Sequence, residues 1–240
     1  MIGEWILRGV LIVLFLYGLP LMIMALQFKV NEWFHPDITY NDPLAHRLVK
    51  KFAKLILWYG RVKYTLHGAE HQRHENVVIY SNHQSTFDGV ILNDIFIDDH
   101  VGGIIKDGIY KIPIVPFWMR VRRHLPLNRE NNREGIKTML QAIEYAKSGQ
   151  PFFIFPEGTR SNGKEMLPYR DGAFKLAEKS KQAIQVMVIH NGYEHKYFMP
   201  KRIHIELLPA IEYDEVKELD SKGLSSLVRT KMQEALDRGI

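Results

Sequence analysis

The sequence lacks cysteine entirely, and this absence excludes several kinds of chemistry at once. Without cysteine among its 240 residues, the chain can form no disulfide, no Cys-based zinc site and no thiol nucleophile. A covalent intermediate would therefore need another side chain. The sequence also has no internal repeat, no low-complexity tract and no internal linker, so we expect one globular domain with an appendage rather than an array of domains.

An excess of acidic charge is also missing. Lys and Arg number 32 against 27 Asp and Glu, and the formal net charge is +5. A basic chain favours anionic partners such as phosphates, nucleic acid or acidic lipid surfaces, and charge alone does not choose among them. Nucleic acid ranks last, because the sequence shows no zinc module, no aromatic RNA-binding motif and no basic tail.

Charge disappears completely from one stretch near the amino terminus. The twenty residues from Gly9 to Phe28 are uncharged and mostly apolar, which is about the length of a helix that crosses a bilayer. Pro20 lies in the middle and would kink a helix, so a re-entrant or shallow hairpin is an alternative. A cleaved signal peptide and a buried soluble helix fit the length less well.

The residues after this stretch are rich in cations. The apolar stretch is preceded by a single cation, Arg8. The cations that follow it include Arg47, Lys50, Lys51, Lys54, Arg61 and Lys63. By the positive-inside tendency, we predict a membrane protein whose main domain lies on the cytoplasmic face. Leu48, Phe52, Leu55, Ile56 and Tyr59 recur at helical spacing, which predicts an amphipathic helix. Its apolar face lies either in the acyl chains of a lipid leaflet or against the domain.

Beyond residue 60, short β-branched runs alternate with longer amphipathic runs. The predicted strands are 62–66, 76–81, 103–105, 151–155, 184–189 and 202–208, and the predicted helices lie near 87–97, 132–147, 171–180 and 222–237. In the clearest helix, Ile136, Met139, Leu140 and Ile143 share one face. The alternation predicts an α/β domain, a central mixed sheet flanked by helices, at residues 61–240, preceded by membrane-associating, membrane-embedded helices at residues 1–60.

The first informative motif comes after the predicted strand 76–81. His83 and Asp88 lie five positions apart, and the carboxylate can fold back onto the imidazole and fix its tautomer. His83 is therefore the best candidate for a general base. The competing interpretation is a helix cap formed by Ser85, Thr86 or Asp88. Ser85 as a nucleophile is disfavoured, because no Gly-x-Ser-x-Gly turn presents it.

The second motif comes after the predicted strand 151–155. Glu157, Gly158, Thr159 and Arg160 supply a glycine that allows close backbone approach, a hydroxyl group and a guanidinium that can grip two oxygens. These are the parts of a phosphate or carboxylate site, although a simple polar turn is the alternative.

Two further cations come after apolar runs and can lie at the same sheet edge. Lys106 can bind a phosphate or reach a thioester carbonyl, and Arg129 is the better phosphate ligand. Either can equally be a solvated surface charge. We expect no metal site, because the histidines of residues 70–75 surround an arginine in a turn-like stretch.

Together the two motifs resemble those of the glycerolipid acyltransferases. Residues 83–88 resemble their His-x4-Asp motif, and Phe155–Ser161 resembles their Phe-Pro-Glu-Gly-Thr-Arg-Ser motif. The stretch 162–176 is similar to the segment directly after that motif in 1-acyl-sn-glycerol-3-phosphate acyltransferases, and Lys106 matches the lysine of a further block that includes Pro113. The resemblance runs from about Arg61 to Tyr193.

This resemblance implies transfer of a fatty acyl chain from acyl-CoA or acyl carrier protein to the 2-hydroxyl of lysophosphatidic acid, which gives phosphatidic acid. It implies no bound cofactor beyond that acyl co-substrate. It also implies His83 and Asp88 as a catalytic pair without a covalent acyl-enzyme, and a glycerophosphate site made by Arg129, Glu157, Gly158, Thr159, Arg160 and Lys106. Alternative acceptors are glycerol 3-phosphate and other lysophospholipids, and an alternative of a different class is a non-catalytic tether that binds phosphatidic acid.

The chain departs from the family pattern in two places. Asn128 stands where an aspartate usually precedes the arginine of the second block, so a carboxylate has no role there. The usually proline-containing fourth block has none in Ile184–Ile189, which leaves the preference for acyl chain length open.

Overall fold

The computed structural model describes residues 5, 8, 15, 18–34, 42–112, 115–128, 131–196, 199–200 and 202–240. In chain order the helices and strands are α2 (Leu19–Phe34), α3 (Pro43–Tyr59), β1 (Lys63–His67), η2 (Ala69–His71), β2 (Val77–Ser81), α4 (Asp88–Ile95), β3 (Gly102–Lys106), η3 (Asp107–Lys111), α5 (Val115–Arg122), β4 (Leu125–Leu127), α6 (Asn132–Lys147), β5 (Phe152–Ile154), η4 (Asp171–Phe174), α7 (Lys175–Ser180), β6 (Ala183–His190), η5 (Gly192–Glu194), β7 (Arg202–Leu207), α8 (Tyr213–Val216) and α9 (Ser221–Arg238).

The strands form one seven-stranded mixed sheet in the order β1-β7-β6-β2-β5-β3-β4. All neighbours are parallel except β6 and β7, which are antiparallel. The central strands β2 and β6 are buried along their whole length, as parallel strands covered on both faces should be. The predicted α/β domain with a mixed central sheet is confirmed.

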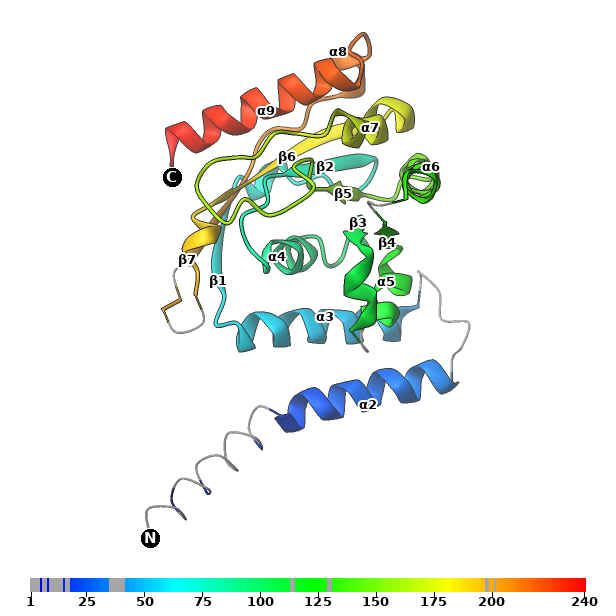
Figure 1. The fold of residues 1–240 in the computed structure, drawn as a ribbon, viewed down its shortest axis with the longest axis vertical. Helices are drawn as coiled ribbons and strands as arrows, with labels where there is room; N and C mark the ends of the chain where they lie inside the picture. Colours follow the sequence, from blue (N-terminus) through cyan, green and yellow to red (C-terminus); the bar gives the residue numbers. More distant parts are fainter. Residues whose placement is uncertain are drawn as a thin grey trace.

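Helices cover both faces of this sheet (Figure 1). On one face, α6, α7 and α9 pack over the largest apolar core. On the other face α4 packs on a second core, and α3 and α5 form a third core on the outer side of α4. Because β2, β5, β3 and β4 are parallel neighbours, the loops at their carboxyl ends leave the sheet at one common edge.

Most predicted elements lie where the sequence placed them, and the misses are short. The helix at 132–147 has the predicted bounds, and its N-cap Asn131 accepts hydrogen bonds from the backbone of Arg133 and Glu134. The predicted helix 171–180 is divided into η4 and α7. The sequence missed α5, β4 and α8, because these elements of eight, three and four residues are too short to show a periodicity.

The apolar face of α3 lies against the domain. Val49, Phe52 and Ala53 are buried in the core shared with α5, and the Phe52 ring meets Trp118 edge to face at 5.2 Å. Of the two alternatives for this helix, burial of the apolar face in lipid is therefore wrong. The solvent-facing side of α3 carries Arg47, Lys51 and Lys54 instead.

The structure describes only part of the apolar stretch from Gly9 to Phe28, namely residue 15 and residues 18–28. Its described part belongs mainly to α2, which begins at Leu19 with Pro20 in its first turn, where a proline removes no intrahelical hydrogen bond. Among the described residues, no helix combines the length and the apolar character that a membrane span requires.

Candidate active site

The two sequence motifs lie in the loops after β2 and β5, which are adjacent parallel strands. His83 comes two residues after the end of β2, and Asp88 is the first residue of α4. Glu157 comes three residues after the end of β5. The strand order therefore brings both motifs to the same edge of the sheet.

Asp88 is fully buried and holds the first loop together. Its Oδ2 accepts hydrogen bonds from His83 Nδ1 at 2.8 Å, from the backbone N–H of Gln84 at 2.6 Å and from that of Ser85 at 2.8 Å. Its Oδ1 accepts a fourth from Ser85 Oγ at 2.6 Å. The first turn of α4 also favours a negative charge at this position. These four hydrogen bonds fix the orientation of the carboxylate.

His83 is oriented by this carboxylate and by an aromatic neighbour. Its ring stacks on Phe155 with centroids 4.2 Å apart and planes 13° apart, and its side chain is 20% exposed. With Nδ1 bonded to Asp88, the ring keeps Nε2 for another partner, and no described residue bonds to that nitrogen. This arrangement favours the general-base interpretation over a helix cap, since the side chain of the N-cap residue, Phe87, makes no capping hydrogen bond.

Three hydrogen bonds join the two motifs directly. The backbone N–H of His83 donates to Glu157 Oε1 at 2.7 Å, and the backbone N–H of Ser161 donates to the His83 carbonyl at 2.8 Å. The third runs from an Arg160 guanidinium nitrogen to Thr86 Oγ1 at 2.5 Å. A base and a cation separated by seventy-seven residues in sequence are thereby parts of one site.

Glu157 is almost wholly buried, and each of its two carboxylate oxygens accepts a backbone hydrogen bond. Besides the His83 amide, its carboxylate accepts the backbone N–H of Leu167 at 2.8 Å through Oε2. Burial raises the pKa of this carboxyl, and the two backbone N–H groups act in the opposite direction. The prediction that Glu157 binds the glycerophosphate stays a prediction, and its geometry favours positioning of the two loops.

Gly158 needs its small size for a contact within the chain. Its φ is +70°, and a Cβ atom added there would lie 2.9 Å from Arg170 Nε. The close approach predicted at this glycine is therefore made by the Arg170 side chain. Thr159 and Arg160 come next, on the surface of the same turn.

Lys106 lies at the end of β3, beside β5, and is exposed at the same sheet edge. Its ammonium group has no bonding partner among the described residues. Arg129 and Pro113 lie outside the described residues, so their predicted roles stay predictions. β4 ends at Leu127, two residues before Arg129.

Three residues that support the site were missed by sequence reasoning. The Asn82 side chain bonds both the N–H and the carbonyl of Ile189 in β6, at 2.8 and 2.9 Å. Gln84 Oε1 accepts the Gly192 N–H at 2.8 Å. Both residues flank His83, and their position in the motif was the available signal. Arg229 of α9 holds the Leu167 carbonyl at 2.7 Å, and no sequence pattern marks it.

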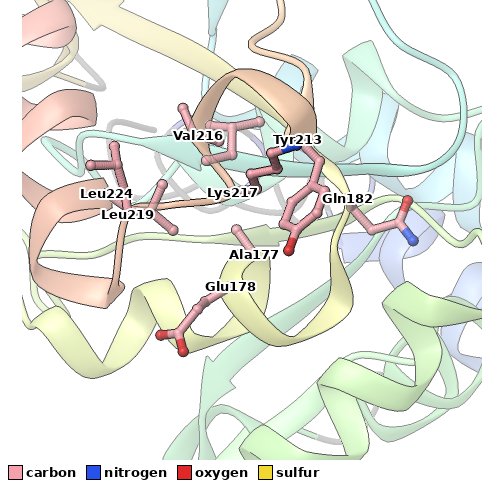
Figure 2. A pocket seen from close by; sticks show the side chains of 9 residues that line it. Ala177, Glu178, Gln182, Tyr213, Val216, Lys217, Leu219 and Leu224 are labelled. Atoms are coloured by element: carbon pink, nitrogen blue, oxygen red, sulfur yellow. The ribbon is translucent and has the colours of Figure 1, made fainter.

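A small cavity of about 30 Å³ lies elsewhere in the molecule, between α7, α8 and the start of α9 (Figure 2). Its lining includes Ile184, near the amino-terminal end of β6, whereas His83 lies beyond the carboxyl end of the parallel neighbour β2. The cavity is thus at the opposite end of the sheet from the two motifs, and it has room for about one water molecule. In the described part of the chain, no group of His, Asp and Glu side chains has the geometry to hold a metal ion.

The fold and the site define the class of protein. A histidine oriented by a buried carboxylate, beside a cation-bearing loop at the carboxyl edge of an α/β sheet, is typical of an enzyme that takes a proton from a hydroxyl group near an anion. Residues 63–190, more than half of the chain, match the family model described as Acyltransferase. The chain belongs to the acyltransferase family.

Several known proteins are similar to this chain. A 1-acyl-sn-glycerol-3-phosphate acyltransferase of Borreliella burgdorferi is 25% identical over 202 residues, which cover 81% of this chain and 80% of that protein. A chloroplastic enzyme of the same name from Arabidopsis thaliana is 31% identical over 62% of this chain, and one from Saccharomyces cerevisiae is 32% identical over 52%. The match spans less than half the length of these last two relatives, 43% and 42%.

One solved structure shares the fold. The crystal structure of the 1-acyl-sn-glycerophosphate (LPA) acyltransferase PlsC from Thermotoga maritima matches with a TM-score of 0.72 over 97% of this chain and 96% of that chain. The sequence identity is 19%, so this match shows the architecture alone.

Proposed function

We propose that this acyltransferase moves a fatty acyl chain from a thioester, acyl-CoA or acyl-ACP, to the sn-2 hydroxyl of 1-acyl-glycerol 3-phosphate and so makes phosphatidic acid. The names of several relatives support this acceptor. The observation that carries the proposal is the His83–Asp88 pair, which hydrogen bonds join to the loop of Arg160. This arrangement puts a base for a hydroxyl group next to a cation for a phosphate.

The mechanism depends on the bonding of His83. As the acceptor oxygen attacks the thioester carbonyl carbon, the hydroxyl proton passes to His83 Nε2, while Nδ1–H stays bonded to Asp88. Collapse of the tetrahedral intermediate breaks the C–S bond, and the leaving sulfur takes the proton back from His83. The exposed Lys106 at the end of β3 is our candidate for stabilising the oxyanion or a phosphate.

No covalent acyl-enzyme is needed in this scheme. A thioester is already activated, and the hydroxyl of Ser85, two residues from the base, is engaged in other hydrogen bonds. Ser85 Oγ donates to Asp88 at 2.6 Å and accepts the Phe87 N–H at 3.2 Å. We therefore propose direct transfer in a ternary complex of enzyme, donor and acceptor.

The acceptor's phosphate is assigned to Arg160, with Thr159 beside it and Lys106 on the neighbouring strand end. A guanidinium can form two parallel hydrogen bonds to phosphate oxygens, and only one Arg160 nitrogen is bonded to Thr86. Arg129 is included from the family resemblance. Clamping the phosphate would fix the distance between the sn-2 hydroxyl and His83.

We further propose that the protein works at a bilayer, with the catalytic domain on its cytoplasmic face. The apolar composition of residues 9–28 supports membrane association. So does the outer side of α3, where Arg47, Lys51 and Lys54 lie between the exposed side chains of Leu44 and Trp58. Cations flanked by an aromatic residue suit a lipid headgroup region.

A kinetic experiment with purified full-length protein tests the proposal. Lysophosphatidic acid, glycerol 3-phosphate and lysophosphatidylcholine are each offered with a panel of acyl-CoA and acyl-ACP donors. We expect phosphatidic acid from the first acceptor with intersecting initial-rate patterns, which indicate a ternary complex. Preferential acylation of another acceptor would show that lysophosphatidic acid is not the acceptor. Ping-pong kinetics or a trapped acyl-Ser85 adduct would overturn direct transfer.

A further inference from the structure

The side chain of Arg170 is a further cation in the Arg160 loop, and no sequence motif singled it out. Its Nε and Cδ lie 2.9 and 3.1 Å from the place where a Cβ atom of Gly158 would be. A non-glycine residue at position 158 would be strained at the φ of +70°, and its Cβ atom would displace the Arg170 side chain from this position. The fold keeps this space open for an arginine that crosses the turn.

The backbone ties Arg170 to the motif that contains Arg160. The Arg170 N–H donates to the Pro156 carbonyl at 2.9 Å, and the Gly158 N–H donates to the Phe155 carbonyl at 3.0 Å. The adjacent Tyr169 ring is covered by the Arg229 guanidinium, 5.0 Å from the ring centroid. The backbone of Arg170 is thus anchored at Pro156, the residue before Glu157, and Glu157 accepts the hydrogen bond of the His83 amide.

The guanidinium itself has no partner within the described part of the chain. It makes no hydrogen bond or ion pair with any described residue. The nearby Glu157 carboxylate is not a partner of Arg170. It accepts hydrogen bonds from two backbone N–H groups, and the arginine whose charge lowers its pKa is Arg229. An arginine that lies across the turn at Gly158, in the same loop as Arg160 and without a described partner for its charge, is suited to an anionic ligand.

We infer that Arg170 forms a second phosphate subsite, with Gly158 as the residue that makes room for it. This inference rests on the proposed function, because both substrates of that reaction carry phosphate. The acceptor has its glycerol phosphate, and the donor has the phosphates of coenzyme A or of phosphopantetheine. The shared chemistry is a phosphate group, and the two sources are separated by experiment.

The test uses two soluble probes on the full-length protein. Glycerol 3-phosphate carries the acceptor's headgroup, and adenosine 3′,5′-bisphosphate carries the nucleotide phosphates of the donor. Each is titrated calorimetrically into wild type, Arg170→Gln and the control Lys164→Gln, and each is also assayed as an inhibitor of acyl transfer. Lys164 is an exposed cation of the same loop, also without a described partner.

We expect Arg170→Gln to weaken one probe by about tenfold to a hundredfold, as for loss of charge-assisted hydrogen bonds, and Lys164→Gln to leave both within about twofold. Weakening of glycerol 3-phosphate assigns the subsite to the acceptor, and weakening of the bisphosphate assigns it to the donor. If Arg170→Gln binds both probes as wild type does, or if Lys164→Gln has an equal effect, the inference is wrong.

Two further variants keep the test decisive if Arg170→Gln fails to fold. Arg170→Lys keeps the charge without the planar fork and should show a smaller loss for the same probe. Gly158→Ala should weaken the same probe by less than Arg170→Gln does, because it displaces the exposed Arg170 side chain without removing its charge, and adding it to Arg170→Gln should change probe binding little further. If the wild-type protein catalyses no acyl transfer, the proposed function is wrong. The calorimetric titrations would still decide whether Arg170 binds phosphate.

Discussion

At the scale of single residues, the site depends on two buried carboxylates with different tasks. Asp88 accepts hydrogen bonds from the His83 imidazole, from two backbone N–H groups and from a hydroxyl, so it fixes the orientation of the general base. Glu157 accepts one backbone hydrogen bond from each of two loops, so it fixes the distance between the two motifs. Neither carboxylate has to contact a substrate to be required for the reaction.

The charge of Asp88 should be essential for activity. Asp88→Asn keeps the size of the side chain but cannot stabilise an imidazolium and can fix the wrong His83 tautomer. We expect kcat to fall on the order of 10²–10⁴-fold with little change in the KM of either substrate. Steady-state kinetics check this, with circular dichroism to confirm folding, and an active variant would refute the dyad.

Glu157→Gln tests positioning against substrate binding. Glutamine offers a single oxygen, so one of the two backbone N–H groups of His83 and Leu167 would face an NH₂ group. We expect a loss of about 1–3 kcal/mol in unfolding free energy and a lower kcat at nearly constant acceptor KM. The exposed Glu165→Gln in the same loop is the matched control. A rise in acceptor KM alone would instead restore direct phosphate binding.

The residue scale also shows which parts of the site the sequence could and could not predict. His83, Asp88 and Arg160 are recognisable because each comes after an apolar run that becomes a strand of the sheet. Arg170 and Arg229 were missed, since their roles depend on contacts with Gly158 and with the Leu167 carbonyl. Such contacts depend on how loops pack, and no spacing in the sequence encodes them.

At the scale of elements, amphipathic patterns predicted where helices occur better than they predicted which side of each helix packs on the domain. The helix 132–147 is correct in both bounds, yet Ile136 and Leu140 of its predicted apolar face are 62% and 57% exposed. Met139 and Ile143 of the predicted face do pack on the core, and Ala142 and Ala146 complete the packed face. Periodicity locates a helix, and the neighbouring elements decide which side is covered.

The same distinction gives a prediction for α3. Phe52 is 6% exposed and packs on Trp118, so Phe52→Ala should cost about 3–5 kcal/mol of unfolding free energy. Its exposed neighbour Lys51→Ala should change stability by less than about 0.5 kcal/mol. Denaturant unfolding of both variants measures the difference. Wild-type stability of Phe52→Ala combined with lost vesicle binding would instead place this face in lipid.

At the scale of the whole molecule, the fold buries two histidines and partly buries a third, which favours their neutral form. Burial lowers the pKa of His100 and His190, and it lowers the pKa of the wholly buried His124 well below its usual 6.5, with Arg122 adding to the effect. The unfolded chain therefore binds more protons than the folded chain below about pH 6.5. Stability should fall as the pH decreases from there.

His124 allows this acid sensitivity to be measured. Its Nε2 lies 3.1 Å from Asn93 Oδ1, and glutamine can donate to the same oxygen without titrating. Each such histidine contributes up to about 1.4 kcal/mol per pH unit between its unfolded and its lowered folded pKa. We expect His124→Gln to flatten the decline of unfolding free energy between pH 6.5 and pH 5. Parallel curves for variant and wild type would contradict this.

The whole-molecule account joins the mixed sheet, the dyad and the cation-bearing loops in one proposed reaction at a membrane. Its central claim is that His83 is the base for acyl transfer to lysophosphatidic acid. The most direct measurement is phosphatidic acid formation from lysophosphatidic acid and a radiolabelled acyl thioester by full-length wild type and by His83→Ala, with vesicle binding of both as the control. The account predicts that the variant binds vesicles like wild type and loses transfer on the order of 10²-fold or more. Equal product formation by both proteins would contradict it.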